Sequence, residues 1–212
     1  LCFAIPKLLF TLVSLVGLAM RALSPVAWRA ANVVALLIAV SVVGIVVYGL
    51  CAGWRRLTVK EVELRFADLP QQFDGYRIVQ MSDMHIGTYH AAPEAVKRIV
   101  DEVNALQPDM ICFTGDLVNS SPAELDIFDD DLSRLKAKDG VFSIMGNHDY
   151  CMYNRHSSQT ARMKAIAEVK ARERRYGWQL LLNEHKVVHR GGDSIAIIGV
   201  ESAKVAFGYE DV

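Results

Sequence analysis

The residues from Ala30 to Gly53 carry no charged side chain and are almost all apolar. About 20 apolar residues in a helix are enough to cross the hydrocarbon core of a bilayer. Trp28 and Arg29 precede the stretch, and Trp54 follows it, as is usual for aromatic and basic side chains at the membrane interface. The stretch predicts a membrane-spanning helix, because its length without charge disfavours the alternative, a buried helix of a soluble domain.

A second apolar stretch, from Leu1 to Met20, precedes it and is broken near its start by a proline and a lysine. We expect a hairpin of two helices with spans at about 1–20 and 30–53, joined by residues 21–29 with Ser24-Pro25 as the turn. A cleaved signal peptide fits less well, because a longer span follows. The chain begins with Leu rather than Met, so we expect an internal fragment or a processed product.

Basic residues flank the predicted spans and bear on their orientation. The joining segment holds Arg21 and Arg29, and the far side holds Arg55, Arg56 and Lys60. Cytoplasmic loops carry an excess of Lys and Arg. The side that carries the residues after Lys60 is therefore favoured to be cytoplasmic by one charge only, which leaves the side of the membrane open.

After about residue 57 the sequence has ordinary composition and alternates expected strands with expected helices. Strands are expected at Thr58–Phe66, Tyr76–Ser82, Asp109–Thr114, Gly140–Met145, Trp178–Leu182, Lys186–Arg190 and Ser194–Val200, and helices at Pro93–Leu106, Glu124–Lys138 and Thr160–Tyr176. Strands that alternate with helices favour a largely parallel sheet covered on both faces. The fold class predicted for this part is therefore α/β.

Charge and cysteine content exclude some classes of function. The net charge is -1, so no basic field of the size needed to attract nucleic acid is present, and no nucleic-acid partner is expected. The spacing of the four cysteines matches neither a zinc site nor a disulfide framework.

Side chains that bind metal ions follow three of the expected strands. The first strand ends in Ser82-Asp83-Met84-His85, the second in Gly115-Asp116 and the third in Gly146-Asn147-His148-Asp149. In an open α/β sheet, ligands bind beyond the carboxyl ends of the strands. Carboxylate, imidazole and amide groups gathered there suit a pair of divalent ions, and such a pair supports hydrolysis at phosphorus by an activated water. We therefore expect one site that combines Asp83, His85, Asp116, Asn147 and His148.

The succession D-x-H, G-D and G-N-H-D resembles the calcineurin-like metallophosphoesterase superfamily. The stretch from Phe73 to Gly87 is similar to the membrane-associated bacterial branch, which includes the YkuE-like and YaeI-like proteins. The resemblance runs from about Leu57 to the end. It implies an incomplete α/β/β/α metallophosphoesterase-like sandwich preceded by an N-terminal transmembrane helical hairpin. Residues 1–57 would form the transmembrane region, and residues 58–212 the N-terminal part of the calcineurin-like phosphoesterase domain.

The resemblance also implies a role for each residue of the site. Asp83 and His85 would bind the first of two divalent metal ions (Mn²⁺, Zn²⁺ or Fe²⁺), Asp116 would bridge both ions, and Asn147 would bind the second. His148 would bind no metal; it would stabilise the transition state or protonate the leaving oxygen as a general acid.

The sequence departs from the family pattern in two ways. Asn119 stands where many members carry an acidic residue that orients the motif histidine. The family also completes its site with a further His and a late Gly-His-x-His, which do not occur after Val200, so we expect this chain by itself to be inactive. His90 and His156, in loops near the site, are alternatives that could contact substrate. His185 and His189 are expected at the surface or in packing.

The function implied is metal-dependent hydrolysis of a phosphoester or pyrophosphate bond in an integral membrane protein, with a bacterial inner membrane as the expected location. The expected partners are the lipid bilayer and a phosphorylated small-molecule or lipid substrate. One type of relative in the superfamily cleaves UDP-diacylglucosamine, which suggests a lipid-linked pyrophosphate. The alternative is a non-catalytic membrane-bound interaction module with a remnant metal site. A nuclease is disfavoured, because no basic groove with aromatic residues is evident.

Overall fold

The computed structural model describes residues 4–21, 24–51, 53, 57–155 and 158–202. The chain forms two compact units, Leu1–Glu61 and Val62–Val212. The first unit holds the apolar helices, and the second holds the sheet and its helices.

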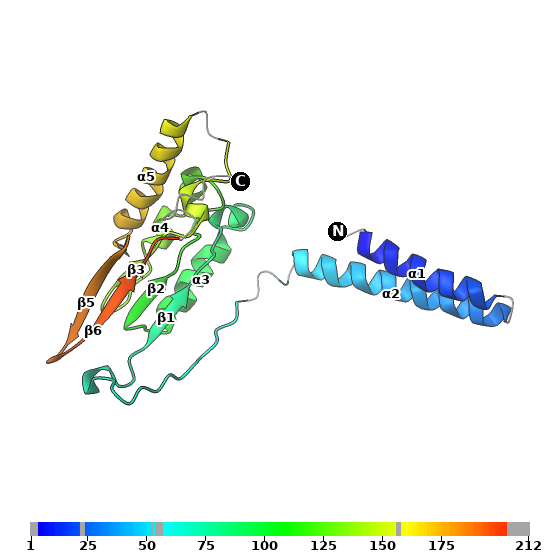
Figure 1. Ribbon diagram of the computed structural model, residues 1–212, viewed down its shortest axis with the longest axis horizontal. Coiled ribbons are helices and arrows are strands. Elements are labelled where there is room, and N and C mark those ends of the chain that lie inside the picture. The colour runs from blue at the N-terminus through cyan, green and yellow to red at the C-terminus, as the bar shows by residue number, and fades with distance from the viewer. Residues whose placement is uncertain (1–3, 22–23, 52, 54–56, 156–157, 203–212) are drawn as a thin grey trace. The chain divides into compact units, whose positions relative to one another are not determined.

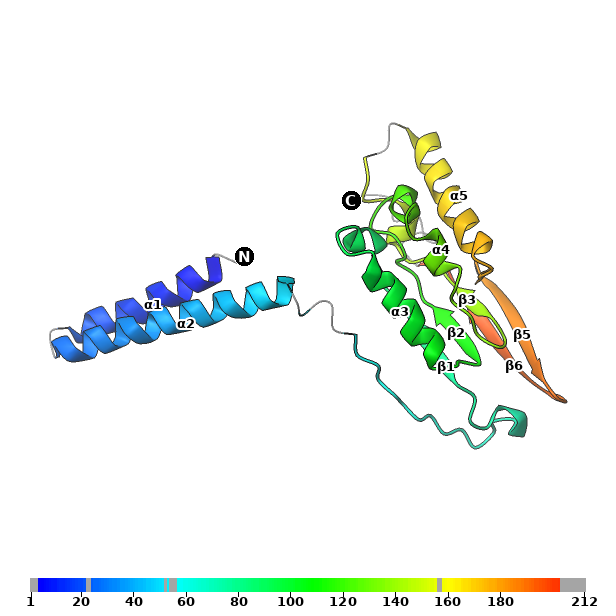
Figure 2. The same cartoon turned by 180° about the vertical axis from the view of Figure 1, so that it is seen from behind.

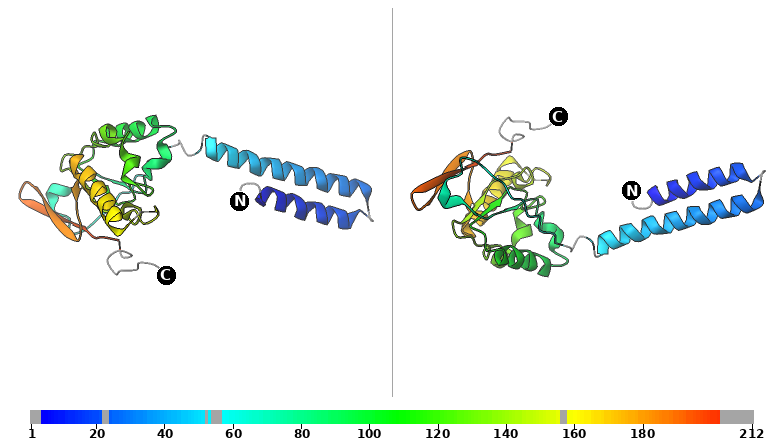
Figure 3. Two further views of the ribbon diagram at one scale, coloured as in Figure 1. Left: turned by 90° about the horizontal axis from the view of Figure 1, so that it is seen from above. Right: turned by 90° about the horizontal axis from the view of Figure 1, so that it is seen from below.

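The first unit is a pair of antiparallel helices, α1 (Ala4–Met20) and α2 (Pro25–Cys51), which lie side by side (Figure 1, Figure 3). A Cβ atom added at Gly17 would lie 2.6 Å from the Cβ of Ala31, so small residues allow the close approach of the helices. Of the described residues, Pro25–Gly49 of α2 is the one helix long and apolar enough to cross a membrane, and Ala4–Ala19 is a shorter apolar helix.

The predicted joining segment, residues 21–29, is too long, because residues 25–29 belong to the second helix. The helix α2 begins at Pro25, so that Trp28 and Arg29 lie within it. Proline suits the first turn of a helix because the missing N–H would have no partner there. The Ser24 hydroxyl also accepts a hydrogen bond from the Ala27 N–H at 3.3 Å, as an N-terminal cap does. The sequence signal for a turn at Ser24-Pro25 was a signal for the start of a helix.

The second unit contains a four-stranded parallel sheet in the order β1-β2-β3-β4 and a two-stranded antiparallel hairpin, β5-β6. Its elements are β1 (Ile78–Met81), α3 (Glu94–Ala105), β2 (Met110–Phe113), α4 (Asp129–Leu132), β3 (Val141–Ser143), α5 (Gln159–Arg175), β4 (Gln179–Leu180), β5 (Glu184–Arg190) and β6 (Asp193–Gly199), and they can be followed from two sides (Figure 1, Figure 2). The predicted α/β class with a parallel sheet is confirmed.

Both faces of the parallel sheet are covered, and alternate residues of β2 show this. Ile111 and Phe113 belong to the larger core cluster with residues of the three helices α3, α4 and α5. Met110 belongs to a smaller cluster with Val188 of β5, against which Ile195 of β6 also packs. Because side chains alternate along a strand, one face of the sheet packs on helices and the other on the hairpin. The described residues thus form helix, sheet and hairpin layers.

The strand expected at Thr58–Phe66 is not present. These residues are exposed and pair with no other strand among the described residues. Alternating polarity favours an extended chain, but a strand also needs a partner to satisfy its backbone groups. Here Glu63 and Arg65 pair locally, with 2.8 Å between Nε of the arginine and the carboxylate oxygen.

The helix expected at Glu124–Lys138 is broken into a 3-10 turn, Pro122–Leu125, and the four-residue α4. The chain leaves the helical path after α4 because Asn104 of α3 bonds to it from outside. The Asn104 side chain donates to the carbonyl of Arg134 at 2.8 Å and accepts from the N–H of Lys136 at 3.1 Å. The sequence pattern could not show that these tertiary bonds replace helical ones.

Candidate metal centre

The loops that follow β1 and β2 are joined by main-chain hydrogen bonds. The N–H of Asp83 donates to the carbonyl of Gly115 at 2.9 Å, and the N–H of His85 donates to the carbonyl of Asp116 at 3.1 Å. The D-x-H and G-D motifs therefore lie next to each other at the carboxyl end of the sheet. This backbone pairing brings the side chains of the two motifs close together.

Two glycines allow the loop after β3 to approach the loop after β2. Gly115 has φ of 94°, and a Cβ atom there would lie 2.3 Å from the main-chain nitrogen of Gly146. A Cβ atom on Gly146 would lie 2.1 Å from Oδ1 of Asp116. Both distances are too short for a side chain, so glycine is required at both positions if Asp116 is to reach the Asn147-His148 turn.

Three of the predicted metal-site residues have left-handed backbone conformations. The φ angles are 52° at Asp83, 43° at His85 and 58° at Asp116. Such angles are uncommon for residues other than glycine, although Asp and His tolerate them better than most. Strained conformations of this kind cluster at functional sites, where the surrounding structure holds them.

Asp149 is fully buried, and its carboxylate links the loop after β2 to the loop after β3. Its carboxylate accepts hydrogen bonds from the N–H groups of Asp116 (2.8 Å), Leu117 (2.8 Å), Val118 (3.1 Å) and Gly146 (2.9 Å). Burial raises the pKa of Asp149 to about 6, although the N–H donors oppose the shift. The sequence analysis assigned no role to Asp149. Its position as the last residue of the Gly-Asn-His-Asp motif could have indicated one.

The donor atoms of His85, Asp116 and His148 all lie within 4.8 Å of one another, and this group could hold a metal ion. Nε2 of His85 is 4.0 Å from Oδ2 of Asp116 and 3.8 Å from Oδ1 of Asp83. Asp83, whose side chain is 65% exposed, therefore borders the group without belonging to it. One predicted residue from each of the three loops therefore belongs to the group, whereas Asp83 and Asn147 are not among its members.

His148 lies among the possible ligands, although the resemblance gives it a catalytic role. Its main-chain N–H donates to Oδ1 of Asp116 at 2.9 Å, and its ring meets that of His85 edge-on, with centroids 4.5 Å apart. Its Nδ1 lies 2.6 Å from the main-chain carbonyl oxygen of Asn119. A carbonyl can only accept, so Nδ1 carries a proton and Nε2 is the nitrogen available to a metal ion or a leaving oxygen.

The side chain of Asn119 does not bond to His148. Its amide donates to the hydroxyl of Thr88 at 3.2 Å. The loop that presents the Asn119 carbonyl is fixed by Glu124, whose carboxylate accepts from the N–H groups of Asn119 (2.6 Å), Ser120 (2.9 Å) and Ser121 (3.0 Å). The sequence analysis missed Glu124; the Ser121-x-x-Glu124 spacing of a capping box could have revealed it.

Asn147 follows Gly146 in the same turn, and its side-chain amide donates to the hydroxyl of Tyr153 at 2.9 Å. The ring of Tyr153 also stacks on that of His148, with centroids 4.3 Å apart and planes inclined by 28°. Tyr153 was not singled out from the sequence, where no motif distinguishes it from an ordinary loop tyrosine.

The other histidines that the structure describes lie outside this group. Nε2 of His90 lies 2.9 Å from the carbonyl oxygen of Glu124, and its ring packs on Phe128, so His90 supports the fold. His156 lies outside the described residues. His185 and His189 are exposed on β5, as expected.

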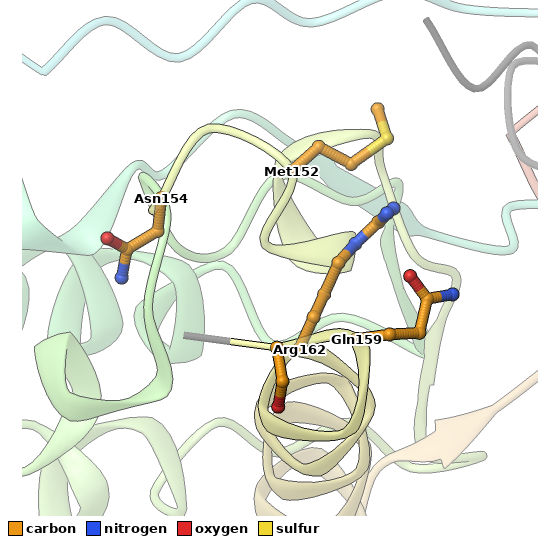
Figure 4. Close-up of a pocket in the computed structure, with 5 residues that line it drawn as sticks. Met152, Asn154, Gln159 and Arg162 are labelled. Carbon is orange, nitrogen blue, oxygen red and sulfur yellow. The ribbon is translucent and has the colours of Figure 1, made fainter. Parts of the chain in front are cut away.

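A pocket lies beside the site where the loop after β3 leads into α5. Its lining residues are Met152, Asn154, Ser158, Gln159 and Arg162 (Figure 4). Arg162 also donates from Nε to the carbonyl of Tyr150 at 3.4 Å. None of the three donor residues lines this pocket, so we assign it no part in the metal centre.

The family model described as calcineurin-like phosphoesterase matches residues 76–204. This chain belongs to that family. The match includes every residue of the predicted site and confirms the resemblance seen in the motifs. Family membership supports phosphoester hydrolysis with divalent metal ions, and the His85, Asp116 and His148 group is a possible place for an ion.

Curated relatives agree with this assignment. A transmembrane protein with metallophosphoesterase domain from Danio rerio is 36% identical over 104 residues, which are 49% of this chain and 24% of the relative. The UDP-2,3-diacylglucosamine pyrophosphatase LpxG of Chlamydia trachomatis is 39% identical over 94 residues, 41% of this chain and 27% of the relative. The uncharacterized metallophosphoesterase YkuE of Bacillus subtilis is 35% identical over 91 residues, 40% of this chain and 30% of the relative.

The matched regions thus cover less than a third of each of these relatives. No solved structure shows a significant match. The apolar helix α2 and the relatives named as transmembrane proteins support a membrane association.

Proposed function

We propose that this protein is a membrane-anchored hydrolase that cleaves phosphoester or pyrophosphate bonds with a water activated by two divalent metal ions. The observation that carries the proposal is the convergence of His85, Asp116 and His148, whose donor atoms lie within 4.8 Å of one another. They come from three loops at the carboxyl end of a parallel sheet, where ligands of α/β folds bind.

The donor chemistry fits the proposed ions. Imidazole nitrogens and carboxylate oxygens suit Mn²⁺, Zn²⁺ and Fe²⁺. We assign Asp83 and His85 to one ion, Asn147 to the other and Asp116 to both. Ions held there would lower the pKa of a water molecule and neutralise charge that develops on the phosphoryl oxygens.

His148 is assigned the role of general acid. The Asn119 carbonyl accepts from Nδ1 at 2.6 Å and fixes the ring edge that faces away from the reaction. The proton passed to the leaving oxygen must therefore come from Nε2. Each turnover would begin with a proton on both ring nitrogens. Nε2 would give its proton to the leaving oxygen, and Nδ1 would keep its proton.

For the substrate we favour a lipid-linked pyrophosphate. One relative is named as a UDP-2,3-diacylglucosamine pyrophosphatase, and a membrane-anchored enzyme meets such a lipid at the bilayer surface. In this arrangement α2 spans the bacterial inner membrane and the shorter apolar helix α1 packs beside it, residues 58–212 form part of the phosphoesterase domain, and the basic flanks favour the cytoplasmic side.

Because the 212-residue chain is expected to be inactive by itself, the test measures ion binding and hydrolysis in detergent micelles with the full-length protein, in its unchanged and variant forms. Titration calorimetry with Mn²⁺ and hydrolysis of UDP-2,3-diacylglucosamine are compared for the unchanged chain, Asp116→Asn and the control Asp74→Asn, which changes an exposed turn residue. We expect Asp116→Asn to lose both ion binding and hydrolysis and the control to keep both. A chain that binds no Mn²⁺ and hydrolyses nothing would instead support the rival, a membrane-bound interaction module.

A further inference from the structure

Tyr153 contacts two residues of the proposed site at once. Its hydroxyl oxygen lies 2.9 Å from Nδ2 of Asn147, and its ring stacks on His148 at 4.3 Å. Tyr153 lies in the loop between β3 and α5 and is 55% exposed. Tyr153 belongs to neither buried core cluster. Its contacts with Asn147 and His148 therefore distinguish it from an ordinary surface tyrosine.

The hydroxyl contact involves one end of the Asn147 amide. A side-chain amide has a donor end, the NH₂ group, and an acceptor end, the oxygen. Because the NH₂ group donates to the Tyr153 oxygen, Oδ1 is directed away from Tyr153 and is left available. Oxygen is the end of an amide that binds a divalent cation. The contact therefore occupies the NH₂ end of Asn147 and leaves the oxygen end for an ion.

The ring contact constrains His148 from the side. Its ring contacts two others: Tyr153 stacks on it with planes inclined by 28°, and His85 meets it edge-on at 86°. The hydrogen bond from Nδ1 to Asn119 fixes one edge of the ring but still allows it to tilt about that bond. Stacked aromatic contacts of this kind contribute beyond simple burial and oppose the tilt.

We infer that Tyr153 is a positioning residue of this site: its hydroxyl orients the Asn147 amide, and its ring fixes the plane of His148. The inference rests on the proposed function only in giving Asn147 and His148 their roles. The two halves separate chemically, because phenylalanine keeps the ring and loses the hydroxyl, whereas leucine loses both.

The experiment compares Tyr153→Phe and Tyr153→Leu with the unchanged chain and with Tyr48→Phe, which removes an exposed hydroxyl from α2. In the metal-free 212-residue chain, NMR follows the ring protons of His148 and the side-chain amide protons of Asn147. Both Tyr153 variants should shift the Asn147 amide signals, and Tyr153→Leu alone should remove the ring-current shift at His148. Titration with Mn²⁺ should show affinity reduced about tenfold in both variants, as is typical when a partner of a metal ligand is lost.

Unshifted Asn147 amide signals in Tyr153→Phe, or unshifted His148 ring protons in Tyr153→Leu, would overturn the corresponding half of the inference. Failure of the proposed function looks different: the unchanged chain would bind no Mn²⁺, while the metal-free NMR shifts would still decide the role of Tyr153. Thermal unfolding of each variant confirms that it is folded.

Discussion

Nδ1 of His148 donates to the main-chain carbonyl oxygen of Asn119 and not to any side chain at that position. The family resemblance raised a doubt about Asn119, because an acidic side chain often stands there. In this structure the orienting group is a carbonyl that any residue would provide. What matters is the path of the loop, and Glu124 fixes that path through the N–H groups of residues 119–121.

Glu124→Ala should therefore impair hydrolysis more than Asn119→Ala does. Losing the carboxylate leaves three N–H donors without their acceptor, so the loop shifts and His148 is misplaced. We expect turnover to fall by roughly tenfold or more, since small displacements of a catalytic group have large effects. Asn119→Ala keeps the carbonyl and should stay within about threefold of the unchanged chain. Steady-state kinetics measure both, and equal effects of the two variants would show that the amide side chain matters after all.

Replacement of the two central residues should separate metal binding from acid catalysis. Asp116→Ala removes the carboxylate whose Oδ2 faces His85 and should abolish Mn²⁺ binding. His148→Ala should retain Mn²⁺ while slowing turnover by about 10²–10⁴, the range for loss of a general acid. Calorimetry and kinetics on the same preparations make the comparison.

The structure places His148 close enough to be a ligand, so the contrary outcome is specific. If His148→Ala loses Mn²⁺ as completely as Asp116→Ala does, His148 is a ligand and another group must supply the proton. His189→Ala is the matched control, because that histidine is exposed on β5 outside the donor group.

The sequence predicted most of what depends on local patterns. The first three strands of the sheet were expected, because short apolar runs that end in Asp83, Asp116 or Asn147 have few other interpretations. The meeting of the three loops also followed from the topology, since parallel strands bring their carboxyl ends to one edge.

The rest depends on contacts between residues far apart in the chain. The bonds from Asn104 that end the helical path after α4 cannot be read from residues 124–138 alone. The pairing of His148 with the Asn119 carbonyl cannot be predicted from the sequence either, because every residue has a main-chain carbonyl. Tyr153 was missed for a similar reason: its contacts follow from the path of a loop.

Asp109 offers a stability test at the opposite end of the strands. This buried carboxylate accepts from Nη2 of Arg190 at 2.7 Å and from Nζ of Lys138 at 2.8 Å. Burial alone raises the pKa of Asp109, but these bonds outweigh burial and hold it well below its usual range. Asp109→Asn should lower the free energy of unfolding by about 2 kcal/mol, as expected for lost hydrogen bonds to charged groups.

The sign of the pH dependence follows from the lowered pKa. A carboxylate with a depressed folded pKa stabilises the fold above its unfolded pKa of about 4 and loses that contribution as the pH falls toward the folded value. Urea unfolding between about pH 5 and pH 3 should therefore show a steeper loss of stability in the unchanged chain than in Asp109→Asn. If the free energy of unfolding had the same pH dependence in both proteins, the bonds from Arg190 and Lys138 would make no net contribution to stability.

Membrane insertion of α2 can be tested by alkaline extraction. Only 6% of the most apolar 18-residue window of Pro25–Gly49 is buried, so α1 and the other described residues leave most of its apolar surface uncovered. We expect the chain to remain in the membrane pellet after carbonate treatment, because removal would expose that surface to water. Release into the supernatant would show peripheral attachment. A high-salt wash serves as the control for electrostatic binding.

Glu173 should make the protein less stable as the pH rises. Its side chain is fully buried in α5, where one carboxyl oxygen accepts from the Ser143 hydroxyl at 2.6 Å. Burial raises the pKa of Glu173 to about 8, with the charge of Asp149 adding to the shift and the Ser143 bond opposing it. The folded state then keeps a proton that the unfolded chain releases near pH 4.5, so stability falls as the pH rises from about 5 to 8.

Glu173→Gln keeps the acceptor for Ser143 and carries no charge, and it should remove this slope. Urea unfolding at several pH values measures it, with Glu102→Gln on the exposed side of α3 as the control. An unchanged slope in Glu173→Gln would assign the pH dependence to another buried group.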